Sequence, residues 1–116
     1  MQQLHTLKDI EHAIATHPLV SLYIKASICG VCTVVAAQLD SALAEEGNVY
    51  AVKADIAEIP EMAGRFHVLT APAWLLFYQG KEVERKARFI PPAQMKQKLA
   101  TRIKVAAVYY KTLRTH

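Results

Sequence analysis

Short apolar runs alternate with segments of helical periodicity in this sequence, and this alternation most constrains its fold. The strand-like runs LVSLYIK at 19–25 and NVYAVKADI at 48–56 are followed by predicted helices at 30–46 and 60–66. Strands that alternate with helices pair in parallel through right-handed crossovers. The two runs should therefore be neighbouring parallel strands of one sheet.

A hairpin is predicted downstream. The run APAWLLFY at 71–78 is separated from KEVERKARF at 81–89 by a turn at Gln79 and Gly80. In the second strand one face should carry Val83, Arg85, Ala87 and Phe89. The opposite face should carry the charged residues Glu82, Glu84, Lys86 and Arg88. Such alternation is typical of an antiparallel hairpin with one solvated face. The fold class is therefore α/β, with a mixed sheet of about four strands and helices on both faces.

Two further helices are predicted near the ends of the sequence. Thr6 is a good N-cap, Asp9 suits the first turn, and the helix should end at about His17 because Pro18 follows. After Pro92, a long apolar stripe predicts a last helix that continues to about residue 113. That length exceeds what a small sheet can cover, so the end of the helix could pack against a second subunit.

Length and charge narrow the possible classes of protein. The 116 residues suit one domain, and no apolar run is long enough for a transmembrane helix. Residues 1–84 carry five Lys/Arg against ten Asp/Glu, whereas residues 85–116 carry nine Lys/Arg and no acid. The basic end is most simply a solvated helix, with an acidic partner or an anionic membrane as alternatives. Nucleic acid binding is not expected, because no recognition motif is present.

The only two cysteines, Cys29 and Cys32, form a CxxC motif directly after the first strand-like run. A thiolate at a helix start is stabilised by free backbone amides and the helix dipole. Cys32 lies one helical turn later, so it could resolve a mixed disulfide formed by Cys29. The N-terminus has none of the features of a secretory signal, so we expect a cytoplasmic protein, where a Cys pair is more often catalytic or metal-binding than structural.

With these cysteines, the segment VKADIAEIPEMAGRFHVLTAPAWLLFYQGKEV resembles the thioredoxin family, and the likeness covers nearly all of residues 1–104. The resemblance implies a thioredoxin-like domain at 1–104, and the predicted last helix would extend beyond that domain at 105–116. It implies a protein-disulfide oxidoreductase that needs no cofactor, with electrons from a thioredoxin-reductase-like flavoprotein or a low-molecular-weight thiol. It also implies that Pro72 is cis and that the Ala71 backbone binds an extended substrate.

The motif departs from the family pattern around the cysteines. Ile28 replaces the usual Trp, and Val31 replaces the usual Pro; with Gly30 they should line the substrate groove. A backbone N–H at Val31 would stabilise the thiolate and shift the couple towards oxidising potentials. Arg88 replaces a glycine at the edge of the groove, beside Phe89.

Three further positions could modulate the pair. Tyr23 replaces the family's buried Asp, and a phenol is a poor general base near neutral pH. Lys53 matches the family's partner lysine, and Lys25 could add positive charge near Cys29. Trp74, two residues after Pro72, is expected in the core.

Two other functions compete with redox catalysis. A thioredoxin-like adaptor would dock a partner through the basic helix and show little turnover. A metal site would need four ligands, so CxxC pairs from two subunits would have to share one ion. No metal is expected, because the five histidines are not spaced from each other or from the cysteines as metal ligands would be. These histidines are His5, His12, His17, His67 and His116.

Overall fold

The computed structural model describes residues 1–26, 34, 36, 37, 39–41, 49–87, 97, 98, 100 and 101. Within this part of the chain the elements follow the predicted order, and their bounds are β1 (Gln2–Gln3), α1 (Leu7–Thr16), β2 (Leu19–Lys25), β3 (Tyr50–Asp55), α3 (Met62–Arg65), β4 (Ala73–Tyr78) and β5 (Lys81–Ala87). The described residues between 34 and 41, and those between 97 and 101, are helical. The predicted domain boundary at residue 104 lies outside the described residues.

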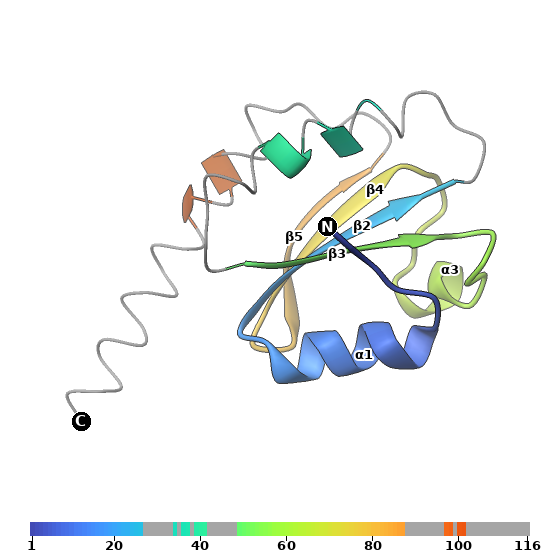
Figure 1. The fold of residues 1–116 in the computed structure, drawn as a ribbon, viewed down its shortest axis with the longest axis horizontal. Helices are drawn as coiled ribbons and strands as arrows, with labels where there is room; N and C mark the ends of the chain where they lie inside the picture. The colour runs from blue at the N-terminus through green and yellow to red at the C-terminus, as the bar shows by residue number, and fades with distance from the viewer. Residues whose placement is uncertain are drawn as a thin grey trace.

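In the part of the chain that the structure describes, the sheet is mixed and has five strands in the order β1-β3-β2-β4-β5 (Figure 1). β2 and β3 pair in parallel, as the alternation predicts, while β4 pairs antiparallel with both β2 and β5. The fifth strand is β1, which the sequence prediction of about four strands did not include. Its two residues are too few to produce a hydrophobic pattern.

Helices cover both faces of this sheet. α1 and α3 lie on one side, and the helical residues between 34 and 41 lie on the other (Figure 1). Alternate residues of β2 and β4 therefore enter two separate cores. The α1-side core includes Ile10, Ile14, Leu22, Met62, Phe66 and Leu75. The Trp74-side core includes Leu19, Tyr23, Leu39, Trp74 and Leu76.

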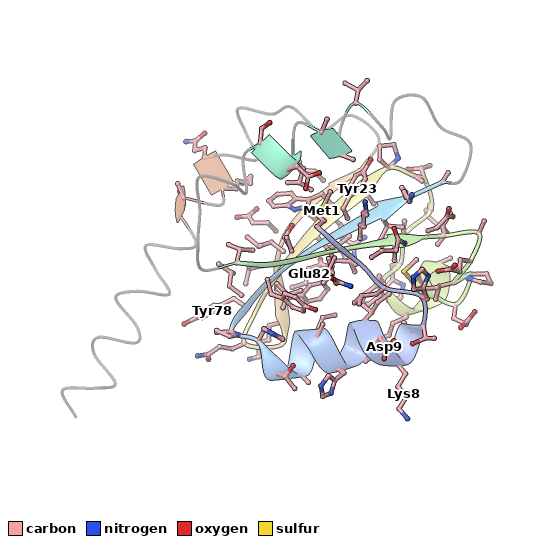
Figure 2. The ribbon with its side chains drawn as sticks, viewed as in Figure 1. Met1, Lys8, Asp9, Tyr23, Tyr78 and Glu82 are labelled. Atoms are coloured by element: carbon pink, nitrogen blue, oxygen red, sulfur yellow. The ribbon has the colours of Figure 1, made fainter. Side chains whose placement is uncertain are left out.

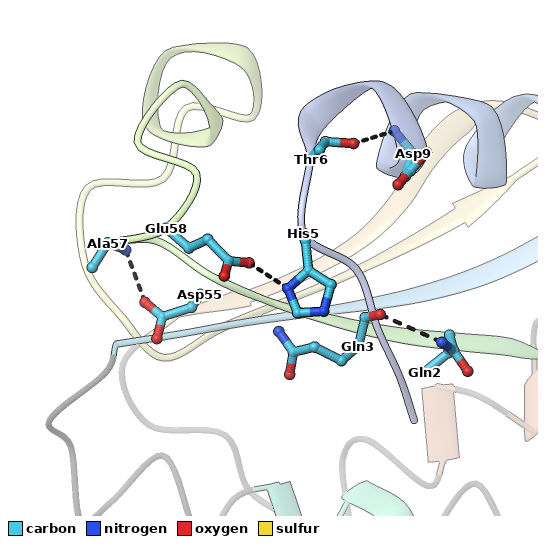
Figure 3. Close-up of polar contacts among 8 residues, drawn as sticks. All are labelled: Gln2, Gln3, His5, Thr6, Asp9, Asp55, Ala57 and Glu58. Carbon is cyan, nitrogen blue, oxygen red and sulfur yellow. Dashed lines mark hydrogen bonds and ion pairs between the residues drawn. The ribbon is translucent and has the colours of Figure 1, made fainter.

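Side-chain caps fix the ends of the elements around α1 and β3. The Thr6 hydroxyl accepts a hydrogen bond from the amide of Asp9 at 3.1 Å, as expected of an N-cap (Figure 3). At the end of β3 the Asp55 carboxylate accepts from the amide of Ala57 at 2.8 Å. His5 lies 2.9 Å from the Glu58 carboxylate, which connects the segment before α1 to the turn after β3.

The β4–β5 hairpin corrects one sequence expectation. Gln79 and Gly80 have φ of 50° and 82°, the left-handed pair that a tight hairpin turn requires. However, the register shifts between Leu76 and Phe77, so simple alternation fails along β5. Val83 packs against the Trp74-side core, while Arg85 reaches backbone carbonyls after α3 on the other side. The two side chains thus face opposite ways, although alternation predicted one face.

Candidate active site

The edge of the sheet where β2 ends is the candidate site. Ile24 pairs with Ala73 at the start of β4, and Lys25 pairs with Asp55 at the end of β3. Pro72, directly before β4, therefore lies beside the point where the chain leaves β2 towards the cysteines. In open α/β sheets, the carboxyl ends of the strands form the usual site for ligands.

The Ala71–Pro72 peptide bond is cis, as the resemblance implies. Pro72 is buried and Ala71 is half-buried, so Pro72 sits against the sheet while part of Ala71 remains accessible. Leu69, two residues before Ala71, is 96% exposed. This loop is the described part of the predicted substrate groove.

The cysteines themselves, Cys29 and Cys32, lie outside the described residues, as do their predicted neighbours in the groove, Ile28, Gly30 and Val31. The structure does place the chain on either side of them. Ala26 follows β2, and the helix that contains Val34 and Leu39 packs its Leu39 against the Trp74-side core.

Tyr23 lies fully buried on the same side of the sheet as Leu39 (Figure 2). Burial raises the pKa of its phenol from 10.0 to about 12, because the charged phenolate would lose its hydration. The phenol is therefore protonated at neutral pH. It can donate a hydrogen bond but cannot take a proton as a carboxylate would.

One row of residues crosses the sheet through Tyr23. Lys53 on β3 is its register partner on one side, and Trp74 on β4 is its partner on the other. The indole Nε1 of Trp74 donates to the Ser21 hydroxyl at 2.8 Å, and both residues are buried. The prediction that Trp74 is a core residue is confirmed, and Lys53 lies beside Tyr23, the position where the family resemblance implies an acid.

The lysines differ from Tyr23 in exposure. Lys53 and Lys25 are both half-buried, and Lys25 lies two residues after Tyr23 on β2. Because side chains alternate along a strand, Lys25 and Tyr23 project from the same face of the sheet. Lys25, the last residue of β2, therefore lies on the sheet face that the helical residues between 34 and 41 cover.

Among the residues that the structure describes, no group of three or more His, Cys, Asp or Glu side chains is placed to hold a metal ion. In the same part of the chain, no helix is long and apolar enough to cross a membrane. Two histidines have other contacts: His5 pairs with Glu58, and the His17 ring stacks on Tyr50 with centroids 4.0 Å apart.

Comparison with known proteins agrees with this geometry. The family model described as Thioredoxin matches residues 3–106. The thioredoxin-like protein YdfQ of Bacillus subtilis is 39% identical over 99 residues, which are 85% of this chain and 88% of YdfQ. Thioredoxin-1 of Saccharomyces cerevisiae is 32% identical over 98 residues, 84% of this chain and 94% of that protein. The chain belongs to the thioredoxin family.

Solved structures show the same fold. Fasciola hepatica thioredoxin has a TM-score of 0.79 with 24% identity, covering 87% of this chain and 98% of that one. A Plasmodium falciparum thioredoxin has a TM-score of 0.80 with 17% identity, with the same coverage. Thioredoxin-family proteins are thiol–disulfide oxidoreductases that act on disulfide substrates with reductases or thiols as electron donors.

Two features of this candidate site were not predicted from the sequence. The exposure of Leu69 is one, since an apolar residue between buried Val68 and half-buried Thr70 gives no signal of its own. The other is Arg85, which was predicted to share a face with Val83. It binds carbonyl oxygens 18 and 19 residues earlier in the chain, and no local pattern reports such a contact.

Proposed function

We propose that this protein exchanges disulfides in protein substrates through the Cys29–Cys32 couple. The observation that carries the proposal is the position of Pro72, which is buried next to the end of β2, four residues before Cys29. Membership of the thioredoxin family supports the reaction type. Ala71 and Pro72 would bind the extended chain that carries the substrate disulfide.

In the proposed reaction, the Cys29 thiolate attacks one sulfur of the substrate disulfide and releases the other as a thiolate. The Cys32 thiolate then attacks the Cys29 sulfur, which frees the second substrate thiol and forms the Cys29–Cys32 disulfide. Two electrons pass to the substrate. Because Tyr23 keeps its proton at neutral pH, the proton of Cys32 would leave to water or to the departing substrate thiolate.

The electron donor that restores the dithiol would be a thioredoxin-reductase-like flavoprotein or a low-molecular-weight thiol. We propose the cytoplasm as the compartment, because two cysteines at CxxC spacing suit a reversible couple better than a disulfide scaffold. Self-association through the C-terminal segment stays a prediction, since residues 102–116 lie outside the described part of the chain.

Reduction of insulin disulfides with dithiothreitol as electron donor tests the proposal. The unaltered protein should accelerate the reaction, and Cys29→Ser should abolish the acceleration because the attacking thiolate is lost. Cys32→Ser should accumulate mixed disulfides that non-reducing electrophoresis detects, because the resolving thiol is missing.

Full activity in the Cys29→Ser protein would contradict the proposal. A further measurement, the reduction potential of the Cys29–Cys32 couple, decides the direction of the exchange. A potential near that of cytoplasmic reductants would indicate a reductase, whereas a much higher one would indicate an oxidase or isomerase. The second outcome would fit the extra backbone donor that Val31 supplies.

A further inference from the structure

The guanidinium of Arg85 joins β5 to the segment between α3 and Pro72. Its Nη1 donates to the carbonyl oxygen of His67 at 3.2 Å, and its Nη2 donates to the carbonyl oxygen of Phe66. Glu82 on the same strand accepts from Nε at 3.1 Å and from Nη2 at 2.6 Å. The planar fork is thus held between one carboxylate and two backbone carbonyls. We call this group the Arg85 clasp.

The two carbonyls that Arg85 binds lie where the chain needs an external donor. Phe66 is the C-cap of α3 and His67 is the residue after it, so neither carbonyl has a partner within the helix. His67 has φ of 54°, so the chain turns sharply at the residue that the clasp holds.

Few apolar contacts hold the segment between the clasp and Pro72. Val68 is buried, but Leu69 is 96% exposed and Thr70 is only half-buried. β4 fixes the far end of the segment, because Ala73 is hydrogen-bonded into the sheet. The near end is held by Val68, which is buried and donates its amide to the Ala63 carbonyl at 3.1 Å, and by the Arg85 clasp.

A second arginine on the same side of the sheet, Arg65, makes different contacts. Arg65 pairs with Glu11 of α1 through Nε–Oε1 at 2.5 Å and Nη2–Oε2 at 3.2 Å. Its guanidinium also lies 4.8 Å from the centre of the Phe66 ring. Arg65 therefore connects α3 to α1, whereas Arg85 connects the segment after α3 to β5.

We propose that Arg85 is a positioning residue for substrate binding. By holding the carbonyls of Phe66 and His67, it sets the path of residues 67–72 and hence the orientation of the Ala71 backbone in the groove. This inference rests on the proposed function, in which that backbone binds the substrate chain. Because Arg85 would act through the carbonyls of Phe66 and His67, its loss should weaken substrate binding and leave the thiol chemistry intact.

The test compares Arg85→Met with a matched variant, Arg65→Met, which removes the other arginine but spares the segment. Arg85→Met should raise KM for insulin about threefold to tenfold, the range for one lost net hydrogen-bonding contact, with kcat unchanged. Arg85→Lys, which keeps the charge but not the fork, should give an intermediate KM. Reaction with the small disulfide 5,5′-dithiobis(2-nitrobenzoate) should not change in either arginine variant.

Arg65→Met should lower Tm without changing KM for insulin. Equal KM values for Arg85→Met and the unaltered protein, or an equal rise in both arginine variants, would overturn the proposal. Amide hydrogen exchange at residues 67–71 gives a readout that needs no turnover: it should accelerate in Arg85→Met and not in Arg65→Met. If the unaltered protein reduces no insulin, the proposed function fails. The clasp is then judged by exchange alone, and equal exchange in the two variants overturns it.

Discussion

Tyr23 puts a phenol where the family resemblance implies a buried carboxylate. The substitution keeps a polar atom in the row between Lys53 and Trp74 but changes its protonation. A carboxylate could accept the proton of Cys32 at neutral pH, whereas a phenol with a pKa of about 12 already holds one. On the sheet face that holds the Trp74-side core, Tyr23 therefore contributes apolar packing and a protonated hydroxyl that can donate a hydrogen bond.

The raised pKa of Tyr23 predicts a loss of stability at alkaline pH. The unfolded state releases the phenolic proton near pH 10, while the folded state keeps it to about pH 12, so the stabilisation present below pH 10 is lost as pH rises towards 12. Tyr23→Phe removes this contribution. Its unfolding free energy in urea should fall less than that of the unaltered protein between about pH 9 and about pH 11, on either side of the tyrosine reference value.

The half-buried Tyr50, which stacks on His17, gives the control for this experiment. Tyr50→Phe should keep the alkaline loss that Tyr23→Phe reduces. Insulin turnover by Tyr23→Phe should be unchanged at neutral pH, because the phenol exchanges no proton there. A parallel pH dependence in the Tyr23→Phe and unaltered proteins would contradict the assigned pKa.

Individual side chains differ in how far the sequence reveals their roles. Tyr23 and Trp74 stand in apolar runs, so their burial could be predicted. The Ser21 hydroxyl that accepts the Trp74 hydrogen bond could not, because the pairing of β2 with β4 decides that contact. The partners of Arg85 could not be predicted either. They depend on a β-bulge and on the turn after α3, and neither feature produces a recognisable pattern in the local sequence.

At the scale of elements, the Thr6 cap determines where α1 begins. Thr6→Ala removes the acceptor for the amide of Asp9 and should lower the free energy of unfolding by about 1 kcal/mol. Thr16 gives a matched control, since its hydroxyl donates to the His12 carbonyl within the helix and caps no free amide. Thr16→Ala should change stability by no more than about 0.5 kcal/mol.

Chemical denaturation of the two threonine variants measures this difference. An equal loss in both would contradict the capping role of Thr6. Thr6→Ser, which keeps a hydroxyl acceptor, should recover most of the stability that Thr6→Ala loses.

Element positions were predicted well where the local pattern was strong. β2 has the predicted bounds because Leu19–Lys25 is a mostly apolar run rich in strand-forming residues, and the hairpin turn lies at the predicted Gln79 and Gly80. β1 and the bulge were missed for a common reason. Both are defined by the strand beside them, since β1 exists only through pairing with β3 and the bulge only through the extra residue opposite β4.

At the scale of the whole molecule, the sheet divides the core into two parts that share strands. Leu22 on β2 faces the α1-side core, and Leu76 on β4 faces the Trp74-side core; both are fully buried. Because β2 and β4 are paired along their length, neither core can be lost while the other keeps its strands. Unfolding should therefore be a single transition.

Leu22→Ala and Leu76→Ala test this coupling from opposite faces. Each should lower the free energy of unfolding by about 2–5 kcal/mol, the usual range for a buried leucine. Trp74 is the only tryptophan and lies in one core, so its fluorescence reports that side, while far-UV circular dichroism reports the whole chain. The two midpoints should coincide in each variant. A Leu22→Ala protein whose dichroism midpoint falls below its fluorescence midpoint would show that the cores unfold separately.

The antiparallel pairing of β4 beside β2 also has a consequence during translation. The ribosome completes Cys29 and Cys32 well before it reaches Pro72, and β4 must follow before Ala73 can pair with Ile24. Until then the emerging chain carries two thiols without the substrate groove proposed above. In that interval the thiols would react with oxidants and other thiols as those of an unfolded peptide do. Selection among disulfide substrates would begin only after β4 has been made and has paired with β2.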